Sequence, residues 1–478
     1  MSRSGVLAAA LLLGACAGFA SDPSHAQAVA AATGCPQFHC TPEATGIMSQ
    51  PIVGSASLAS TITLSDASLG TLHAQGCSGN GKLLACLADP PPGTRGILKI
   101  IDTTTRPTLK VIHTDGSFAS SKRLVASWNN GQVPFMFSDG RVGAGDARSY
   151  KIYDFTKAIP RMTSAALPWP APQGATTLGL TDLSNGYGVV ARTDGVLTFI
   201  KMARGTVVGS LSLAGQNGEP VILNSPPSAS NGVLYAVAKG DAGYLFAVSM
   251  DGNAAPTTWN WRYANAGKIS ASPVDVSPSE SGYSKTLVLL AVSDSDLGTP
   301  QLLGILDNGS SATVQWYIQL AQNLPVTPSV DGINRRVYFM YQNGHKVYEY
   351  PLYVGGSAPV ANATGKSYDL QALAGMPDLH FNGHIGAIQS GLASDFTLLL
   401  AGTTSSSGPS SSQYMVAFRP NPAPGAAWAT MVSAEAARAT GAWNLSPSST
   451  PGIYCPLLVE VGTGGGTGPG SLALMCDH

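Results

Sequence analysis

Eight short apolar runs recur in this chain at intervals of about fifty residues. Each run is continuous, rich in aliphatic, β-branched and aromatic residues, and bounded by Gly, Ser or Pro turns, with no helical periodicity. A strand that is apolar on both faces suits a sheet packed between two neighbouring sheets. The pattern therefore predicts tandem small sheets, whose core strands are Leu83–Cys86, Pro134–Phe137, Tyr187–Ala191, Val233–Val237, Leu287–Val292, Val337–Tyr341, Thr397–Gly402 and Cys455–Val461.

The segments around these runs repeat as well. A Ser/Pro-rich stretch precedes two of them, and a third strand then ends in an acidic or polar turn that is followed by a tryptophan. The matching segments are Ser272–Asp275, Thr327–Asp331, Leu245–Gly252 with Trp259, Leu303–Gly309 with Trp316, and Met415–Phe418 with Trp428. These features predict a four-stranded unit whose outer tryptophan packs between neighbouring units.

This pattern resembles the pyrroloquinoline-quinone (PQQ) repeat, A-x-D-x-x-x-G-x-x-x-W, of quinoprotein-like β-propellers. The resemblance implies an all-β fold, an eight-bladed β-propeller of four-stranded antiparallel blades, with seven blades as the alternative. The last unit lacks an outer strand, and Ser57–Leu64 is an orphan strand ahead of the first unit. We therefore expect Ser57–Leu64 to pair with Ser471–Cys476 and close the ring, since an open sheet edge invites aggregation.

The N-terminus has the features of an export signal. Arg3 precedes a short apolar run from Val6 to Leu13, which is too short to span a bilayer as a helix. Leu13-Gly14-Ala15-Cys16 resembles a lipobox and predicts lipidation of Cys16, whereas Ala26-Gln27-Ala28 fits ordinary signal peptidase. Both alternatives stay open. The predicted organisation is a signal peptide at 1–28, a tail at 29–55 and the propeller at 56–478.

Six cysteines remain after removal of the signal, and an even number in an exported chain favours disulfides. Cys77 and Cys86 flank a turn sequence, Cys455 and Cys476 lie on the last two predicted strands, and Cys35 and Cys40 bound a small loop. We predict the pairs Cys35–Cys40, Cys77–Cys86 and Cys455–Cys476. None of these cysteines forms a C-x-x-C metal motif.

Ligands of such propellers usually lie on the face that carries the connections between second and third strands and between successive blades. The longest predicted connection, Gly355–His384, contains Asp378, His380 and His384, a residue set that suits a divalent metal. Two aspartate-rich segments, around Asp139/Asp146 and Asp294/Asp296, are predicted on the same face as candidate calcium loops.

The PQQ dehydrogenases of this family carry an adjacent Cys-Cys ring over the quinone and a Ca²⁺ held by Glu and Asn. This chain has no adjacent cysteines, and the rest of that set is not found in it. The resemblance is therefore nearer to the non-enzymatic lipoprotein members of the family. No cofactor is predicted; PQQ with Ca²⁺ belongs to the alternative, enzymatic interpretation.

Charge limits the partners. Lys and Arg number 26 and Asp and Glu 27, so charged residues make up only 11% and the net charge is −1. This excludes a nucleic-acid-binding surface. The sequence predicts a monomeric, non-catalytic binding or scaffold protein outside the cytoplasm: a bacterial outer-membrane lipoprotein, periplasm-facing or on the surface, or a secreted protein. Its partner would be an envelope protein or an extracellular polymer. The alternative is an enzyme at the channel mouth, either a divergent quinoprotein oxidoreductase or a hydrolase or lyase.

Overall fold

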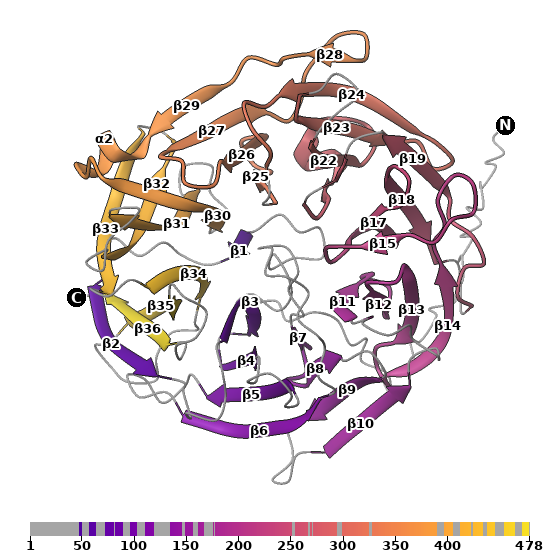
Figure 1. The fold of residues 1–478 in the computed structure, drawn as a ribbon, viewed down its shortest axis with the longest axis horizontal. Coiled ribbons are helices and arrows are strands. Elements are labelled where there is room, and N and C mark those ends of the chain that lie inside the picture. Colours follow the sequence, from indigo (N-terminus) through magenta and orange to yellow (C-terminus); the bar gives the residue numbers. More distant parts are fainter. Residues whose placement is uncertain are drawn as a thin grey trace, which may run out of the picture.

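The strands of this chain form small sheets that are arranged in a ring (Figure 1). The fold is that of a computed structural model. It describes residues 47–49, 57–63, 72–80, 82–88, 96–102, 110–118, 134–145, 149–155, 161–166, 175, 177–250, 254–265, 268–269, 271–293, 299–324, 327–389, 396–404, 412–421, 424–433, 437–444, 454–463 and 471–477.

The described strands fall into eight sheets, which we number in chain order. Sheets 1 to 3 each run from an innermost to an outermost strand in sequence order and are antiparallel throughout. Their strands are β3 (Leu72–Gly79), β4 (Leu83–Ala88), β5 (Gly96–Asp102) and β6 (Lys110–Phe118); β7 (Phe135–Met136), β8 (Val142–Gly145), β9 (Ser149–Asp154) and β10 (Arg161–Ala166); β11 (Thr177–Asp182), β12 (Tyr187–Arg192), β13 (Val196–Lys201) and β14 (Thr206–Ser212).

Sheets 4 to 6 follow the same plan with additions. Sheet 4 has β15 (Ile222–Leu223), β16 (Ser228–Ser230), β17 (Val233–Lys239), β18 (Gly243–Ser249) and β19 (Trp261–Asn265). Sheet 5 has β20 (Lys268–Ile269), β21 (Val274–Val276), β22 (Leu287–Ser293), β23 (Gln301–Asp307), β24 (Ala312–Gln319) and β28 (Val360–Ala361). Sheet 6 has β25 (Ser329–Asp331), β26 (Arg336–Met340), β27 (Lys346–Pro351) and β29 (Lys366–Asp369). The short helix α1 (Pro278–Ser281) joins β21 to β22.

Sheets 7 and 8 each include a strand from the N-terminal part of the chain. Sheet 7 comprises β1 (Ile47–Ser49), β30 (Leu379–Gln389), β31 (Thr397–Thr404), β32 (Gln413–Arg419) and β33 (Gly425–Ser433). Sheet 8 comprises β34 (Ala437–Asn444), β35 (Tyr454–Thr463), β36 (Ser471–Asp477) and β2 (Ser57–Thr63). The strand β1 thus belongs to the ring, although the sequence places it in a separate tail.

The predicted fold class is wrong in its uniform four-stranded antiparallel blades. Sheets 4 and 7 have five strands and sheet 5 has six, and the pairs β1–β30 and β24–β28 are parallel. In sheets 4 and 5 the innermost strand is split into two pieces that pair with the same neighbour. Pro226, Pro227 and Pro273 lie in these breaks, and proline has no N–H to donate to a ladder. The all-β propeller itself is confirmed.

The predicted ring closure is confirmed. The strand β2 pairs antiparallel with β36, from Ser57 opposite Cys476 to Thr63 opposite Ser471. The N-terminal strand therefore completes the last sheet as its outermost strand, and β3 of sheet 1 lies against β34 and β35 of sheet 8.

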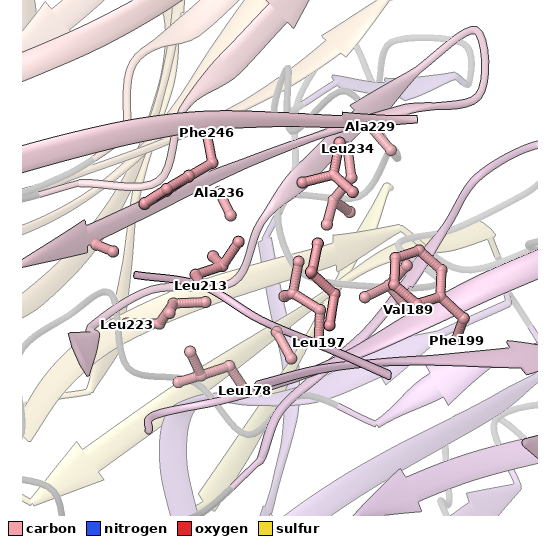
Figure 2. Close-up of a cluster of buried hydrophobic side chains, with 14 of the residues drawn as sticks. Leu178, Val189, Leu197, Phe199, Leu213, Leu223, Ala229, Leu234, Ala236 and Phe246 are labelled. Carbon is pink, nitrogen blue, oxygen red and sulfur yellow. The ribbon is translucent and has the colours of Figure 1, made fainter. Parts of the chain in front are cut away.

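The hydrophobic core is divided between successive sheets. One cluster joins sheets 3 and 4 and contains Val189 and Ala191 of β12 and Leu234 and Ala236 of β17. Figure 2 shows this cluster. The residue between the first two, Val190, packs on the other side with sheet 2. Each of these core strands buries both faces, which explains why it reads as an unbroken apolar run.

When β1 is left out of the count for sheet 7, seven of the eight predicted core runs are second strands of their sheets. The exception is Pro134–Phe137, which contains β7, the innermost strand of sheet 2; the second strand is β8. The strand β7 has only two residues, and the short apolar run around it has the same sequence character as a second strand. The sequence therefore does not distinguish the two.

The tryptophan predicted for the fourth unit is also corrected. The residue that matches Trp316 is Trp261, because Trp316 lies opposite Gly304, Trp261 opposite Ala247 and Trp428 opposite Ala417. Trp261 is 5% exposed, while Trp259 precedes the strand and is only partly buried. A small residue opposite the indole leaves room for the ring, since a Cβ on Gly304 would collide with Trp316.

The segment Gly355–His384, predicted as one long functional loop, is mostly regular structure. It contains β28, which pairs with the outer strand of sheet 5, then β29, the helix α2 (Leu370–Ala374) and the first part of β30. Its short strands alternate with Gly and Pro, so its sequence pattern is that of a loop.

Candidate functional site

Alternate connections of an antiparallel sheet lie on the same side of the ring. We call upper face the side with the connections between second and third strands and between successive sheets, and lower face the opposite side. The propeller family's ligands are expected on the upper face. The best-described polar cluster there lies where the connection from sheet 3 meets sheet 4.

Tyr244 is the centre of this upper-face cluster. It begins β18 and is fully buried. Its hydroxyl lies 2.9 Å from Glu219 Oε1 and in hydrogen-bonding contact with Asp241, and it accepts a hydrogen bond from the backbone N–H of Gln216 at 3.0 Å. A hydroxyl has one proton, so the two carboxylates compete for it.

Two effects set the protonation of this cluster. Burial, together with the hydrogen bond to Asp241, raises the pKa of Tyr244 to about 12, so the phenol stays protonated at neutral pH. The same hydrogen bond lowers the pKa of the Asp241 carboxyl. Asn217 donates to the second oxygen of each carboxylate. Its backbone N–H lies 2.9 Å from Glu219 Oε2, and its Nδ2 lies 3.2 Å from Asp241 Oδ2.

Arg262 fixes the loop that carries Glu219. Its Nη1 donates to the carbonyl oxygens of Ala214 at 3.0 Å and Gly215 at 2.6 Å. Its guanidinium carbon lies 5.5 Å from the ring centres of both Tyr244 and Trp259. The cluster therefore fixes the connection between sheets 3 and 4 to the β17–β18 turn and to the strands β18 and β19 of sheet 4.

The predicted metal residues are only partly described. Asp378 is exposed in the turn before β30, and His380 is partly buried within β30, where it lies opposite Thr403. The side chain of His384 lies outside the described residues. Among the side chains that the structure describes, no three potential metal ligands come together. The metal site stays a prediction.

The candidate calcium loops are predicted on the upper face, but Asp139 does not lie on the upper face. It lies in the turn between β7 and β8, on the lower face, and Asp146, Asp294 and Asp296 lie outside the described residues. Asp139 accepts from Nε of Arg141 at 2.7 Å and from its backbone N–H at 3.1 Å.

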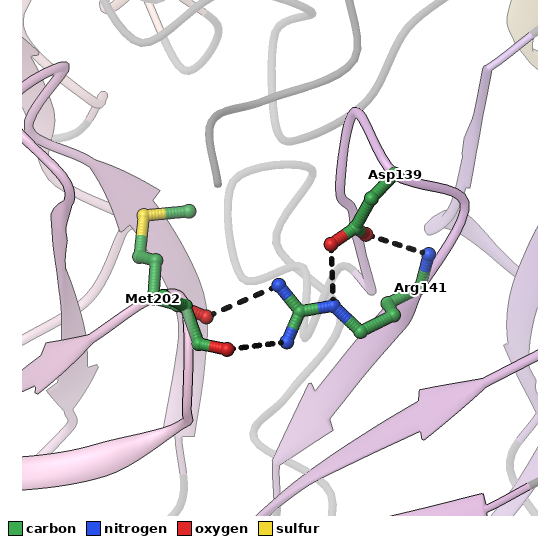
Figure 3. Close-up of polar contacts among 4 residues, drawn as sticks. Asp139, Arg141 and Met202 are labelled. Atoms are coloured by element: carbon green, nitrogen blue, oxygen red, sulfur yellow. Dashed lines mark hydrogen bonds and ion pairs between the residues drawn. The ribbon is translucent and has the colours of Figure 1, made fainter. Parts of the chain in front are cut away.

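Arg141 joins sheets 2 and 3 across the lower face (Figure 3). Its Nη1 and Nη2 donate to the carbonyl oxygens of Ala203 at 3.2 Å and Met202 at 3.3 Å, in the turn between β13 and β14. The guanidinium also lies 4.6 Å from the ring centre of Phe137. Asp139 and Arg141 therefore stabilise the ring.

We expect Arg141→Lys to lower the free energy of unfolding by about 1–2 kcal/mol, because an ammonium group cannot donate to Asp139 and two carbonyls in one plane. Urea unfolding measures the loss. Arg204→Lys is the control, since Arg204 is exposed in the turn that Arg141 contacts, and it should be neutral. Equal effects of the two substitutions would contradict this role of Arg141.

The cysteine pairs remain predictions of which the structure describes only backbone positions. Cys77 and Cys86 are direct partners in the β3–β4 register. Cys455 follows Tyr454 and Cys476 precedes Asp477, and these two neighbours are partners in the β35–β36 register. Cys16, Cys35 and Cys40 lie outside the described residues.

Two carboxylates make contacts that the sequence does not predict: Asp307 connects sheets 5 and 4, and Glu349 connects three strands of sheet 6. Asp307 accepts hydrogen bonds from Tyr235 Oη at 2.6 Å and from Trp261 Nε1 at 2.7 Å. Glu349 is 4% exposed; its Oε1 lies 3.2 Å from Nε of Arg336, and its Oε2 accepts from Tyr368 Oη at 2.6 Å. The acidic turn before the repeat tryptophan signals the first of these; no sequence pattern signals the second.

The residues described here do not assemble the set that a PQQ dehydrogenase uses. The chain has no adjacent cysteines, the upper-face carboxylates Glu219 and Asp241 are engaged with Tyr244 and Asn217, and β1 lies at the ring centre (Figure 1). We derive no chemical step through that cofactor.

Comparison with known proteins identifies the architecture. No protein-family model and no curated protein sequence matches the chain. Among solved structures, a europium-containing methanol dehydrogenase is similar over 93% of this chain and 98% of its own, with TM-score 0.54 and 10% identity. The quinohemoprotein alcohol dehydrogenase of Comamonas testosteroni is similar over 94% and 81%, with TM-score 0.53 and 10% identity.

BamB from Moraxella catarrhalis is similar over 88% of this chain and 99% of its own at TM-score 0.45 and 10% identity, too distant to support an argument. At 10% identity the two dehydrogenases inform on fold, not on activity. The chain has a PQQ-like β-propeller fold, of the kind found in methanol and quinohemoprotein alcohol dehydrogenases.

Proposed function

We propose that this chain works outside the cytoplasm as a non-catalytic binding or scaffold propeller, whose partner is an envelope protein or an extracellular polymer. It acts as a monomer. With 11% charged residues and a net charge of −1, its contacts with the partner rely on hydrogen bonds and apolar area.

The observation that carries this proposal is the position of β1. In the propellers that the sequence resembles, ligands bind at the channel mouth, and in this chain its own strand lies at the ring centre, paired with the innermost strand of sheet 7 (Figure 1). Three of the described charged groups around the ring give further support. Arg141, Arg262 and Asp307 are engaged with the chain's own backbone and side chains.

The proposed location follows from the N-terminal signal. Lipidation on Cys16 would anchor the protein to an outer membrane, facing the periplasm or the surface, and cleavage after Ala28 would release it. No helix in the described part of the chain has the length and apolar character needed to cross a bilayer. Labelling with a radioactive fatty acid, compared with a Cys16→Ala variant, distinguishes the two.

Affinity capture from a cell envelope tests the binding function. We expect a stoichiometric partner whose retention changes less than about threefold between low and moderate salt, because few charges are available to be screened. A loss of retention by orders of magnitude over that range would contradict the proposal, and so would the absence of any partner.

The alternative is an enzyme with its site at the channel mouth, and the similarity in fold to two dehydrogenases favours testing it. The protein is mixed with PQQ and Ca²⁺, separated from free cofactor and examined by absorbance, and its metals are quantified. Stoichiometric quinone absorbance, or a metal lost in His380→Ala, would support the enzyme and contradict the scaffold.

A further inference from the structure

The strand β30 of sheet 7 has a partner on the edge that faces the ring centre (Figure 1). Ile47, Met48 and Ser49 of β1 pair in parallel with Ala387, Ile388 and Gln389 of β30. Among the eight described sheets, only sheet 7 has such an additional strand inside its innermost long strand. The edge of β30 is therefore a place where an extended chain segment binds.

The edge that pairs with β1 belongs to a long strand. It has eleven residues, whereas β25 and β21, innermost in the two preceding sheets, have three each. A strand edge presents a row of backbone N–H and C=O groups, and a longer edge offers more of them in register.

The strand β25 of the neighbouring sheet 6 packs beside this edge of β30. The Ser329 hydroxyl of β25 donates to the carbonyl oxygen of Ile385 at 3.0 Å and is fully buried. This bond fixes β25 against β30 just before the residues that β1 covers, and β1 lies against β25 as well. The edge of β30 that pairs with β1 thus lies where sheets 6 and 7 meet. Ala387 on this edge is fully buried.

The pairing of β1 is short. It covers three residues, and Pro51, which has no N–H to donate, follows two residues later. Parallel ladders are slightly less stable per residue than antiparallel ones, and a three-residue strand lies at the lower limit of strand length. An external segment of similar backbone shape can form the same ladder, and it displaces β1 when its own contacts offset the advantage that β1 gains from covalent attachment.

We propose that the inner edge of β30 at Ala387–Gln389 is a strand-acceptor site, which Ile47–Ser49 fills in the free protein and an extended, uncharged segment of a partner protein takes in the same parallel orientation. This inference rests on the proposed binding function and names its partner class: an extended polypeptide, not a polysaccharide. Main-chain hydrogen bonds supply the affinity in this mode of recognition.

Hydrogen exchange on the full chain tests the site. Met48→Pro removes the central N–H of β1, and Met48→Leu keeps it. N–H groups along a strand point alternately to its two neighbours, so only some amides of 387–389 face β1, and the others face β31. We expect exchange at the amides of 387–389 that face β1 to rise about tenfold or more in Met48→Pro and to stay unchanged in Met48→Leu. Amides of β31 and β32 should exchange alike in all three proteins, which shows that the variants are folded.

A synthetic peptide of residues 45–53 then serves as the external strand. Added to Met48→Pro, it should restore protection at 387–389 and bind at least about tenfold more tightly than to the parent, whose edge is filled. The same peptide with proline at position 48 should do neither.

Equal exchange at 387–389 in the parent and Met48→Pro would overturn the inference, as would lost protection that the peptide does not restore. This test uses no envelope partner. Peptide binding without any captured partner would therefore uphold the acceptor site and contradict the proposed function, while a captured partner with no peptide effect would do the reverse.

Discussion

Replacing Trp316 by alanine should lower the free energy of unfolding by about 3–5 kcal/mol, the range for removal of a large buried aromatic side chain. Trp316 is fully buried, belongs to the core cluster between sheets 5 and 6, and donates from Nε1 to the carbonyl oxygen of Leu352 at 3.0 Å. The substitution removes apolar contact with two sheets and leaves that carbonyl without its donor.

Trp259→Ala is the matched control. Trp259 is partly buried and packs edge to face on Phe246, with 5.3 Å between the ring centres. We therefore expect its replacement to lower the free energy of unfolding by about 1–2 kcal/mol. Trp316→Phe should fall between these values, because it keeps most of the apolar area without the hydrogen bond. Urea unfolding of all three variants measures the order. A loss at Trp259 as large as that at Trp316 would contradict the assignment of the inter-sheet tryptophan.

The second large effect is expected at Asp307. Its carboxylate accepts from Tyr235 Oη and Trp261 Nε1 of sheet 4, and from the N–H of Gly309 at 2.7 Å within its own turn. Asp307→Ala should lower the free energy of unfolding by about 2–4 kcal/mol, because hydrogen bonds to charged groups contribute about 1.5–3 kcal/mol each and two donors are left without their acceptor.

A double-mutant cycle with Tyr235→Phe isolates the connection between the sheets. Burial, and next the hydrogen bond to Asp307, raise the pKa of Tyr235 well above its usual value, so the phenol is the proton donor. We expect a coupling free energy of at least about 1 kcal/mol between the two positions. Strictly additive losses would show that Asp307 acts only within its own turn.

The sequence predicted the features that depend on local pattern. A continuous apolar run implies a strand buried on both faces, and this holds for Val189, Val190 and Ala191, which pack alternately on two sides of sheet 3. The missing outer strand of the last unit and the orphan strand near residue 60 likewise predicted their pairing, because strand edges require partners.

The candidate site was predicted less well than the fold. The upper-face cluster of Tyr244, Glu219 and Asp241 was not predicted, because no spacing marks residues that are up to 25 positions apart and meet only through a loop. Of the predicted metal residues, Asp378 lies in a turn and His380 lies within the strand that follows it.

Local sequence thus determined strand identity, burial and ring closure, since each depends on patterns within a few residues or on a count of strands. The tertiary structure alone decided which polar groups meet. Arg141 reaches carbonyls 61 and 62 residues away, and Asp307 binds donors 46 and 72 residues away. It also decided that Ile47–Ser49 pairs with β30. Such partners are set by how neighbouring sheets pack, because their backbone edges and turns become adjacent only when those sheets have packed against each other.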